Sequence, residues 1–526
     1  MNVIAARRTI KYAAIAAVAS LSFAPLAPTT ASAQRLSPIQ YTVSMPAPET
    51  HLAHVQARIP TGGKPYVDLM MAVWSPGYYV QENYATRVRD ISAEGTDGRT
   101  LAIEHPQPNR WRVTTSGGSS IVLSYTLVCD HSSVTGNAVD TTMAILNGPA
   151  TYITLAEHAK RPHEVALDLP QRWKQSATSL AAAPDGVPNH YEASSYDELA
   201  DSPIIAGNIS FHDFTVAGTH YSLADIGEIP PQWDGALAAQ NLEKIVTADY
   251  RFWGFIPFRK YVFLDVFRRG AGGLEHLNST LLTSSPSATG GGDIRWLQYV
   301  SHEYFHAFNV KRLRPVQLGP FDYEHPPTTP SLWISEGLTT YYGNLMACRG
   351  GVGTRQDVLN SLSKAITSVQ TSPGRRVQTL EQASLDIFST GGSGEGGNRN
   401  TTVSYYDKGL IAGLVLDARI QHATNGRKTL DDMMRLAYKR YGGAHGFTPQ
   451  QWVATASEVA GTDLTPFFHK LVRTTDEIDY SEALDWFGLR FAPSGNAASA
   501  WTLEIRPDAT AQQTAHLNRL TRLYRS

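Results

Sequence analysis

The order of hydrophobic and polar positions divides the chain into a β-rich part and a helical part. Between about residues 40 and 209, apolar and polar side chains alternate over short stretches separated by glycine-containing turns. This spacing predicts an all-β domain, either a sandwich or a saddle-like sheet. The clearest predicted strands are residues 41–44, 54–59, 111–114 and 121–128. No cluster of residues that carries chemistry stands out in this region, so we expect it to have a supporting role.

Helical periodicity dominates from about residue 227 to Val472. The change follows residues 228–231, where two adjacent prolines interrupt the chain. After Val472 the pattern is mixed, with two expected strands at residues 486–491 and 501–505. We therefore predict four segments: a signal peptide at residues 1–33, an N-terminal β-domain at 34–226, a mostly α-helical domain at 227–475 and a short mixed segment at 476–526.

Residues 1–33 have the organisation of an export signal. Arg7 and Arg8 lie in a basic start, residues 12–27 are apolar and rich in alanine, and residues 31–33 form a small-x-small cleavage site. The apolar run is short and contains proline, which argues against a membrane anchor. The arginine pair leaves a twin-arginine export route open beside the general one. We expect a periplasmic or secreted product with no integral membrane segment after signal removal.

Composition narrows the classes of partner. The chain of 526 residues has 45 basic and 47 acidic side chains and a net charge of −2, so no nucleic-acid partner is expected. Its two cysteines, Cys129 and Cys348, are too few for a disulfide framework and are expected to be buried thiols.

The helical part contains His302, Glu303 and His306 in a stretch, residues 294–308, whose apolar positions follow a helical period after a cap at residues 291–293. On a helix, two imidazoles four residues apart share a face and can bind one Zn²⁺ at about 2.0–2.1 Å. Glu303 is then placed to take a proton from a water molecule at the metal. The alternative is a chance match on an amphipathic helix, so the motif needs partners elsewhere.

A zinc site needs a third protein ligand. In the metzincin pattern a glycine and a histidine follow the second ligand, but those positions are occupied by Asn309 and Arg312, which excludes that class. Glu336 is the better candidate, in an otherwise largely apolar second helix that Thr329 is expected to cap, with Pro330 in its first turn. The alternative for Glu336 is a partly exposed surface residue.

Two further stretches offer substrate contacts. A predicted strand at residues 260–267 leads into Gly272, Gly273 and Glu275, where glycines let a backbone approach closely and the carboxylate can meet a cation. The alternative is a plain glycine turn. Downstream, Tyr405 and Tyr406 precede an apolar helix, and a tyrosine hydroxyl there can donate to an oxyanion, although either ring alone would suit a core.

Together these stretches resemble the glycyl aminopeptidase family of gluzincin zinc metallopeptidases. The match covers most of the mature chain in the right order. It rests on residues 74–79, 201–203, 272–276, 302–306, 309–315, 320–323, 332–337 and 404–409.

The resemblance implies an N-terminal β-domain, a mostly α thermolysin-like catalytic domain and one Zn²⁺ per chain. It implies that the zinc ligands are His302, His306 and Glu336 and that Glu303 is the general base. By similarity to the Gly-Ala-Met-Glu-Asn loop of aminopeptidase N-like enzymes, Glu275 would bind the substrate's free amine. Tyr406 would stabilise the tetrahedral intermediate. Many relatives continue into a C-terminal PDZ domain, but too few residues follow position 491 for that fold.

We therefore expect an exported zinc aminopeptidase that acts on peptides with a free N-terminus. The resemblance adds a preference for small first residues, glycine and then alanine. One alternative is a zinc endopeptidase, which needs no amine anchor and makes Glu275 the discriminating residue. A second alternative is a non-catalytic peptide-binding protein built on a peptidase scaffold.

Overall fold

The structure is a computed structural model that describes residues 36–131, 133–157, 160–270, 272–285, 290–389, 397–493 and 501–524. The predicted signal peptide lies outside the described residues. Within them no helix combines the length and the apolar composition that a membrane crossing requires. Cys129 and Cys348 are both free and buried, as expected.

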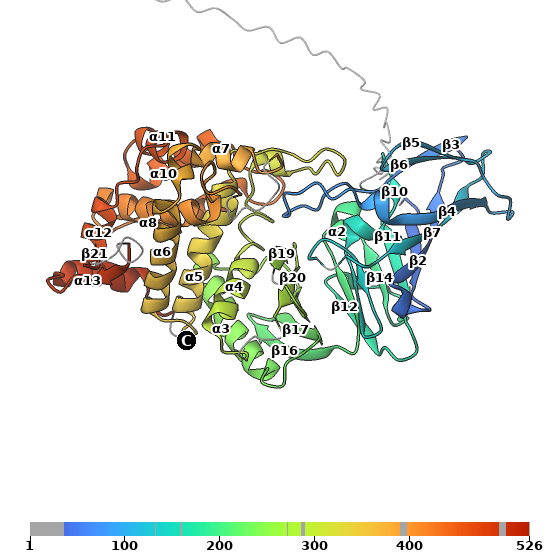
Figure 1. The fold of residues 1–526 in the computed structure, drawn as a ribbon, viewed down its shortest axis with the longest axis horizontal. Helices are drawn as coiled ribbons and strands as arrows, with labels where there is room; N and C mark the ends of the chain where they lie inside the picture. The colour runs from blue at the N-terminus through green and yellow to red at the C-terminus, as the bar shows by residue number, and fades with distance from the viewer. Residues whose placement is uncertain are drawn as a thin grey trace, which may run out of the picture. The chain divides into compact units, whose positions relative to one another are not determined.

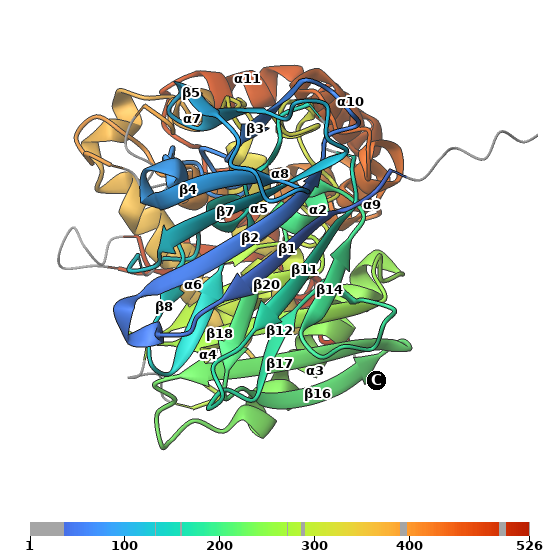
Figure 2. The same ribbon diagram turned by 90° about the vertical axis from the view of Figure 1, so that its right-hand side faces the viewer.

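The β-rich part forms three sheets in the described residues (Figures 1 and 2). Figure 2 looks onto the largest, in which β13, β14, β11, β1, β2, β7 and β4 follow one another across the sheet. The other two have the orders β10-β3-β6-β5 and β12-β15-β9-β8. The strands are β1 (Ile39–Ser44), β2 (Leu52–Pro60), β3 (Tyr66–Met70), β4 (Val88–Gly95), β5 (Ile103–Gln107), β6 (Arg110–Thr114), β7 (Ser120–Val128), β8 (Ala138–Val139), β9 (Met143–Leu146), β10 (Thr154–Leu155), β11 (His163–Asp168), β12 (Gln175–Thr178), β13 (Ala181–Ala182), β14 (His190–Ala193) and β15 (Ile204–Gly207).

Alternation builds this core. In β2, every second side chain is buried and its neighbours face solvent, and Val55, Ala57 and Ile59 join the core of this part of the chain. The four strands predicted from the sequence lie within β1, β2, β6 and β7, which confirms them. Short helical turns lie between the strands: η1 (Pro48–Thr50), η2 (Tyr84–Arg87), α1 (Gly148–Thr151) and α2 (Tyr196–Ala200).

A five-stranded sheet leads into the helical part. Its order is β16 (Ser210–Val216), β17 (Thr219–Gly227), β18 (Lys260–Phe267), β20 (Ser279–Ser284) and β19 (Gly272–Glu275). The predicted strand 260–267 is confirmed by β18, whose nearly continuous burial matches its apolar sequence. The sheet runs across residue 226, where the sequence analysis places its domain boundary. The predicted domain boundaries after residues 33, 226 and 475 stay predictions.

The glycine-rich residues 272–275 form an edge strand rather than a turn. This strand, β19, pairs antiparallel with β20 and has its other edge unpaired among the described strands. The alternative of a plain glycine turn is therefore wrong, because each residue from Gly272 to Glu275 has a partner in β20.

Helices α3 to α11 make up the rest of the helical part, coloured green to orange-red in Figure 1. Their apolar faces form one core with the inner side chains of the five-stranded sheet. Helix α8 lies within this bundle and contacts α5, α6, α9 and α10. The helices are α3 (Gly235–Trp253), α4 (Ile294–Phe305), α5 (Leu338–Arg349), α6 (Arg355–Gln370), α7 (Leu380–Leu385), α8 (Tyr405–Ala423), α9 (Leu430–Tyr441), α10 (Pro449–Ala460) and α11 (Thr465–Arg473), with short turns η3 (Val316–Leu318) and η5 (Pro373–Arg376).

The helix that carries Glu336 begins later than the sequence predicts. Thr329 does not cap it: its hydroxyl lies 3.3 Å from the side-chain oxygen of Gln317 instead. The first turn starts at Ser331, whose carbonyl accepts from Ile334 and Ser335. The backbone then forms a π-turn, η4 (Trp333–Gly337), before it continues as α5.

The C-terminal segment is mixed, as predicted, but its first strand is shorter. Residues 486 and 487 end helix α12 (Ser481–Phe487), and Gly488 closes that helix in the left-handed conformation with φ of 63°. Strand β21 (Leu489–Phe491) therefore starts after Gly488 and pairs with β22 (Leu503–Ile505), and α13 (Ala511–Leu520) follows. The fold class is confirmed: a sheet-rich N-terminal domain, a mostly helical catalytic domain and a short mixed C-terminal segment.

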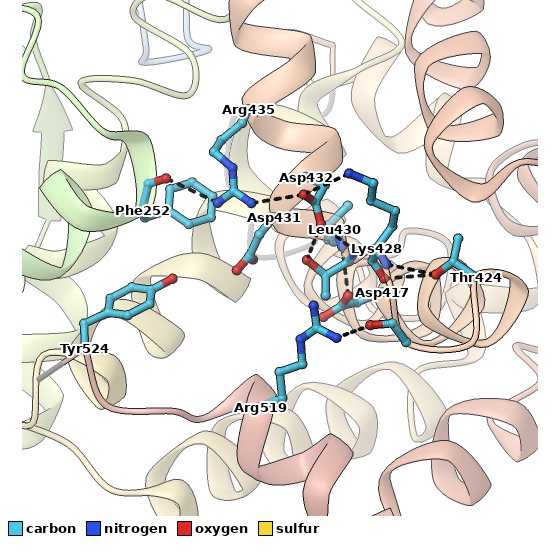
Figure 3. A network of polar contacts seen from close by, with 12 residues as sticks. Phe252, Asp417, Thr424, Lys428, Leu430, Asp431, Asp432, Arg435, Arg519 and Tyr524 are labelled. Atoms are coloured by element: carbon cyan, nitrogen blue, oxygen red, sulfur yellow. Dashed lines mark hydrogen bonds and ion pairs between the residues drawn. The ribbon is translucent and has the colours of Figure 1, made fainter.

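A polar network joins the C-terminal residues to the helical bundle (Figure 3). Arg349 donates to Asp431 at 3.0 Å and to the hydroxyl of Tyr524 at 3.1 Å. Arg519 donates to the carbonyl of Gly426. Residues 37–526 form one compact unit, to which the C-terminal segment belongs.

Candidate active site

Three side chains from two helical elements meet at one point. His302 lies in the last turn of α4, His306 follows the end of that helix and Glu336 lies in the π-turn η4. The Nε2 atoms of the histidines are 2.9 Å apart, and Oε2 of Glu336 lies 3.6 Å from the first and 3.1 Å from the second. Four ligands at about 2.0–2.1 Å from one zinc ion would be separated by roughly 3.3 Å. The three atoms therefore have the spacing of metal ligands.

Glycines allow these elements to approach each other. A Cβ on Gly343 of α5 would lie 2.9 Å from Cα of His302, so α4 and α5 pack with their backbones close together. A Cβ on Gly337 would lie 2.4 Å from Cα of Gly409, which seats η4 against α8. The π-turn and these contacts bring Glu336, 2% exposed, against the histidines. This burial excludes the alternative of a surface glutamate.

Hydrogen bonds at the far side of each ring orient both imidazoles. Nδ1 of His306 lies 2.9 Å from the carbonyl oxygen of Asn309, so Nδ1 carries the proton. Nδ1 of His302 lies 3.2 Å from Oγ1 of Thr340, whose own hydroxyl donates to the carbonyl of Glu336 at 2.9 Å. Oγ1 of Thr340 can therefore accept a hydrogen bond from Nδ1 of His302. When neither Nε2 carries a proton, both Nε2 lone pairs face the carboxylate, and the three acceptors form an arrangement that a divalent cation satisfies.

The charges around this point favour a cation. Burial alone favours neutral forms, but the positive charge of His306 outweighs it and lowers the pKa of Glu336 to about 2. The charges of Glu336, Glu275 and Glu303 likewise outweigh burial at His306 and raise its pKa to about 10. The same three carboxylates would stabilise a metal ion between the ring nitrogens. The donor set of two imidazoles and one carboxylate is a type that holds zinc.

Glu303 lies beside this point and is not one of the three side chains that meet there. It is 6% exposed, and its Oε2 has no hydrogen-bond partner among the described residues. A Cβ on Gly273 would lie 2.3 Å from its Oε1, so the edge strand β19 packs directly on the carboxylate. Burial raises the pKa of Glu303 to about 8. A carboxylate with a raised pKa and a free oxygen can accept and return a proton.

Glu275 ends β19 and faces the same space. Its side chain is 3% exposed, and Oε1 finds no partner in the part of the chain that the structure describes. Burial raises its pKa to about 7, although the charges of His306 and Lys311 oppose this. One ligand atom each from Glu275, Glu303 and His306 lie within 4.8 Å of one another. Gly272 is less involved, because a Cβ there would meet only Val134, at 3.6 Å.

Of the two candidate tyrosines, Tyr406 lies beside the candidate metal ligand His302. It begins α8 together with Tyr405, after the N-cap Ser404. The Tyr406 ring lies 6.1 Å from the ring of His302, whereas Tyr405 is 2% exposed and packs beside Tyr406 at 4.9 Å. Burial and the charge of Glu336 raise the pKa of Tyr406 well above its ordinary value. Its hydroxyl therefore stays protonated as a donor.

The β-rich part reaches this site, which the sequence analysis did not expect. The hydroxyl of Tyr79 donates to Oε1 of Glu336 at 3.3 Å, and a Cβ on Gly77 would lie 2.6 Å from Oε1 of Glu275. Both residues belong to stretch 74–79, one of those that carry the family resemblance. The family resemblance of stretch 74–79 was therefore the one sequence signal that pointed to these residues, although it assigned them no role. Two residues of the β-rich part therefore lie against carboxylates of the site, while its expected supporting role stays a prediction.

The comparisons with known proteins agree with this architecture. An aminopeptidase N family protein from Idiomarina loihiensis is 24% identical with a TM-score of 0.81, over 86% of this chain and 78% of that one. An M1 zinc metallopeptidase from Deinococcus radiodurans, solved with a Tyr-Ser-Ala substrate, is 12% identical with a TM-score of 0.53, over 85% of this chain and 95% of that one. These likenesses show the fold. No curated protein sequence matches the chain.

Two family descriptions match the sequence directly. Residues 40–208 match the Peptidase M61 N-terminal domain, and residues 295–412 match M61 glycyl aminopeptidase. The second range contains His302, Glu303, His306, Glu336 and Tyr406. Together the two ranges span more than half of the 526 residues. The chain belongs to the M61 glycyl aminopeptidase family, a family of peptidases.

Proposed function

We propose that this protein is an exported zinc aminopeptidase that releases small first residues, glycine and alanine, from peptides with a free N-terminus. The observation that carries the proposal is the place of Glu275. Its carboxylate is buried, and its Oε1 has no partner among the described residues. One of its carboxylate oxygens lies within 4.8 Å of ligand atoms of Glu303 and of the metal-ligand candidate His306.

The distance between amine anchor and metal ligands favours an exopeptidase. The α-amino nitrogen and the carbonyl carbon of one residue are about 2.5 Å apart, as bond lengths and angles require. Because Glu275 lies this close to the metal-ligand candidates, its carboxylate can bind the α-amine of the substrate residue whose own carbonyl is attacked. A buried cationic amine also needs such a carboxylate, because an unpaired buried charge is costly. An endopeptidase would instead have to accommodate a neutral peptide bond beside Glu275.

The residues of the site supply complementary steps of peptide hydrolysis. Zinc held by His302, His306 and Glu336 would supply Lewis-acid chemistry at the scissile carbonyl. Glu303 accepts the proton of the attacking water and returns it to the leaving amine, a role that its raised pKa supports. Tyr406 donates a hydrogen bond to the carbonyl oxygen as negative charge develops there.

Small first residues and export are supported by separate observations. The family description names a glycyl aminopeptidase. Glu275, Glu303 and Glu336 are 3%, 6% and 2% exposed, so the amine anchor is buried. Export is supported by the sequence of residues 1–33. Mass spectrometry of the protein expressed with these residues tests that part, because we expect a mature N-terminus at Gln34.

A peptide panel tests the activity. Purified zinc-loaded enzyme is given peptides that begin with glycine, alanine or leucine, each free and N-acetylated, with Glu303→Gln as the inactive control. We expect release of the first residue from free peptides, fastest for glycine and then alanine, and no cleavage after acetylation. Cleavage of an acetylated peptide at an internal bond would identify an endopeptidase. Binding without any cleavage would identify a peptide-binding protein.

A further inference from the structure

We propose that the β-domain completes the active site through residues 74–79, in which Tyr79 positions the metal ligand Glu336 and Gly77 positions the amine anchor Glu275. This inference rests on the proposed function, because it assigns positioning roles towards the same metal and amine sites. It assigns these roles to a part of the chain in which the sequence indicated no chemistry.

The segment is held in one conformation by its own contacts. Trp74 is fully buried and its indole N–H donates to the carbonyl of Asp322 at 2.7 Å. The backbone N–H of Tyr78 donates to the carbonyl of Ser75 at 3.0 Å and closes a turn around Pro76 and Gly77. Gly77 has φ of 97°, and proline followed by glycine suits the two central positions of such a turn. The turn is therefore a fixed support.

Tyr79 acts on the oxygen of Glu336 that does not face the histidines. Its hydroxyl donates to Oε1, while Oε2 faces His302 and His306. The phenol ring is 5% exposed and packs edge-on against Phe388 at 6.2 Å. A hydrogen bond to one carboxylate oxygen fixes the rotation of the carboxylate and therefore the direction of the other oxygen. Tyr79 thus sets how Glu336 presents Oε2 to a metal.

Gly77 acts on Glu275 by direct backbone contact. A Cβ at this position would lie 2.6 Å from Oε1 and 2.9 Å from Oε2 of Glu275, closer than such atoms approach in proteins. The carboxylate therefore rests against the Cα of Gly77, and any side chain there would push it away. Glycine is required both by the positive φ and by this contact.

Zinc affinity tests the role of Tyr79 without reference to turnover. In Tyr79→Phe the ring stays and the hydrogen bond to Glu336 is lost, so we expect the zinc affinity of the apo-protein, measured by chelator competition, to fall about 10–100-fold. Tyr41→Phe is the matched control: Tyr41 is 2% exposed and its hydroxyl donates to the carbonyl of Ile153 at 2.9 Å, in the same β-domain but outside residues 74–79. We expect it to lower thermal stability and leave zinc affinity unchanged. Unchanged affinity in Tyr79→Phe, or an equal loss in Tyr41→Phe, would overturn the assignment.

A double-mutant cycle tests the role of Gly77. We expect Gly77→Ala to keep zinc and to lower kcat/KM on free glycyl peptides at least about tenfold, mainly through KM. Gly218→Ala is the control for backbone conformation, because Gly218 has φ of 82° and no described atom lies within 4 Å of a Cβ there. If Gly77 acts through Glu275, Gly77→Ala causes no further loss in a Glu275→Ala background.

The outcomes separate this inference from the proposed function. If Glu275→Ala alone leaves kcat/KM unchanged, the amine anchor and with it the proposed aminopeptidase mechanism fail. If Glu275→Ala is costly but Gly77→Ala adds its full loss in that background, only the role of Gly77 fails. Should Gly77→Ala not fold, as circular dichroism would show, the zinc measurement on Tyr79→Phe still decides whether the β-domain positions the site.

Discussion

Nζ of Lys311 lies 2.7 Å from Oδ1 of Asp201, in a buried ion pair that joins the segment after helix α4 to the β-rich part. Asp201 also accepts hydrogen bonds from Nδ1 of His276 at 3.1 Å and from the backbone N–H of Leu277 at 2.7 Å. Despite its burial, the positive charge of Lys311 keeps the pKa of Asp201 below its ordinary value. Since His276 follows Glu275 directly, Asp201 connects the end of β19 to the segment that follows α4.

We expect Asp201→Ala to destabilise the protein by about 3–5 kcal/mol, because it leaves the buried charge of Lys311 without a partner. Chemical denaturation followed by tryptophan fluorescence measures this loss. The double variant Asp201→Ala/Lys311→Met removes the unpaired charge and should recover part of the stability. A single variant as stable as the wild type would show that the pair contributes nothing to the fold.

The amount of bound zinc should distinguish the proposed metal ligand Glu336 from the proposed general base Glu303. We expect Glu336→Ala to lose most bound zinc, since it removes one of three ligands, whereas Glu303→Gln should keep zinc and lose turnover. Elemental analysis of dialysed protein and a glycyl-peptide assay on the same samples measure both effects. Full zinc in Glu336→Ala would refute the ligand assignment, and substantial activity in Glu303→Gln would point to another base.

A third expectation concerns the two adjacent tyrosines. Tyr406→Phe should lower kcat about 10²–10³-fold with little change in KM, because an oxyanion donor acts mainly in the transition state. Tyr405→Phe is the matched control, since Tyr405 packs beside Tyr406 and its ring lies in the same cluster. Steady-state kinetics on one free glycyl peptide compare them. If Tyr405→Phe carries the kcat loss, the neighbouring residue has been chosen wrongly.

The parts of the site that local patterns encode could be predicted from the sequence. His302, Glu303 and His306 lie within one helical turn, so their spacing alone places two imidazoles on one face. The alternation in β1, β2, β6 and β7 and the apolar run of β18 likewise identify strands because burial follows a local period. Fold class and motif therefore follow from short-range order in the chain.

Contacts between distant residues could not be predicted in this way. Tyr79 and Glu336 are 257 positions apart, and no local period relates them. The π-turn at Trp333–Gly337 has the same apolar pattern as an α-helix, so the sequence does not distinguish the two. In the structure, this turn packs through Gly337 against Gly409, a residue distant in sequence. The edge strand at Gly272–Glu275 is defined by its pairing with β20, while its glycines taken alone suggest a turn.

A buried carboxylate in the network of Figure 3 makes stability depend on pH. Asp417 is 2% exposed and accepts from the backbone N–H of Leu430 at 2.9 Å, from Gln421 at 3.0 Å and from the hydroxyl of Tyr341 at 3.1 Å. Burial, with the nearby charge of Asp431, raises its pKa from 3.8 to about 6. The folded protein therefore binds this proton more tightly than the unfolded chain does.

The free energy of unfolding should fall as pH rises from about 4 to about 6, because the folded state binds more protons at Asp417 in that window. Raising the pKa of Asp417 from 3.8 to about 6 contributes up to about 3 kcal/mol of stability, which is present below the lower pKa and lost above the upper one. In Asp417→Asn the amide oxygen still accepts from Leu430 and Gln421 and no charge is buried. We expect this variant to be more stable than the wild type at pH 7.5 and to lack this part of the pH dependence.

Urea denaturation at half-unit pH steps measures the free energy of unfolding of each variant. Glu243→Gln, at an exposed carboxylate on α3, is the control for loss of one charge. A pH profile of Asp417→Asn that coincides with that of Glu243→Gln would mean that Asp417 is ionised in the folded protein at no cost.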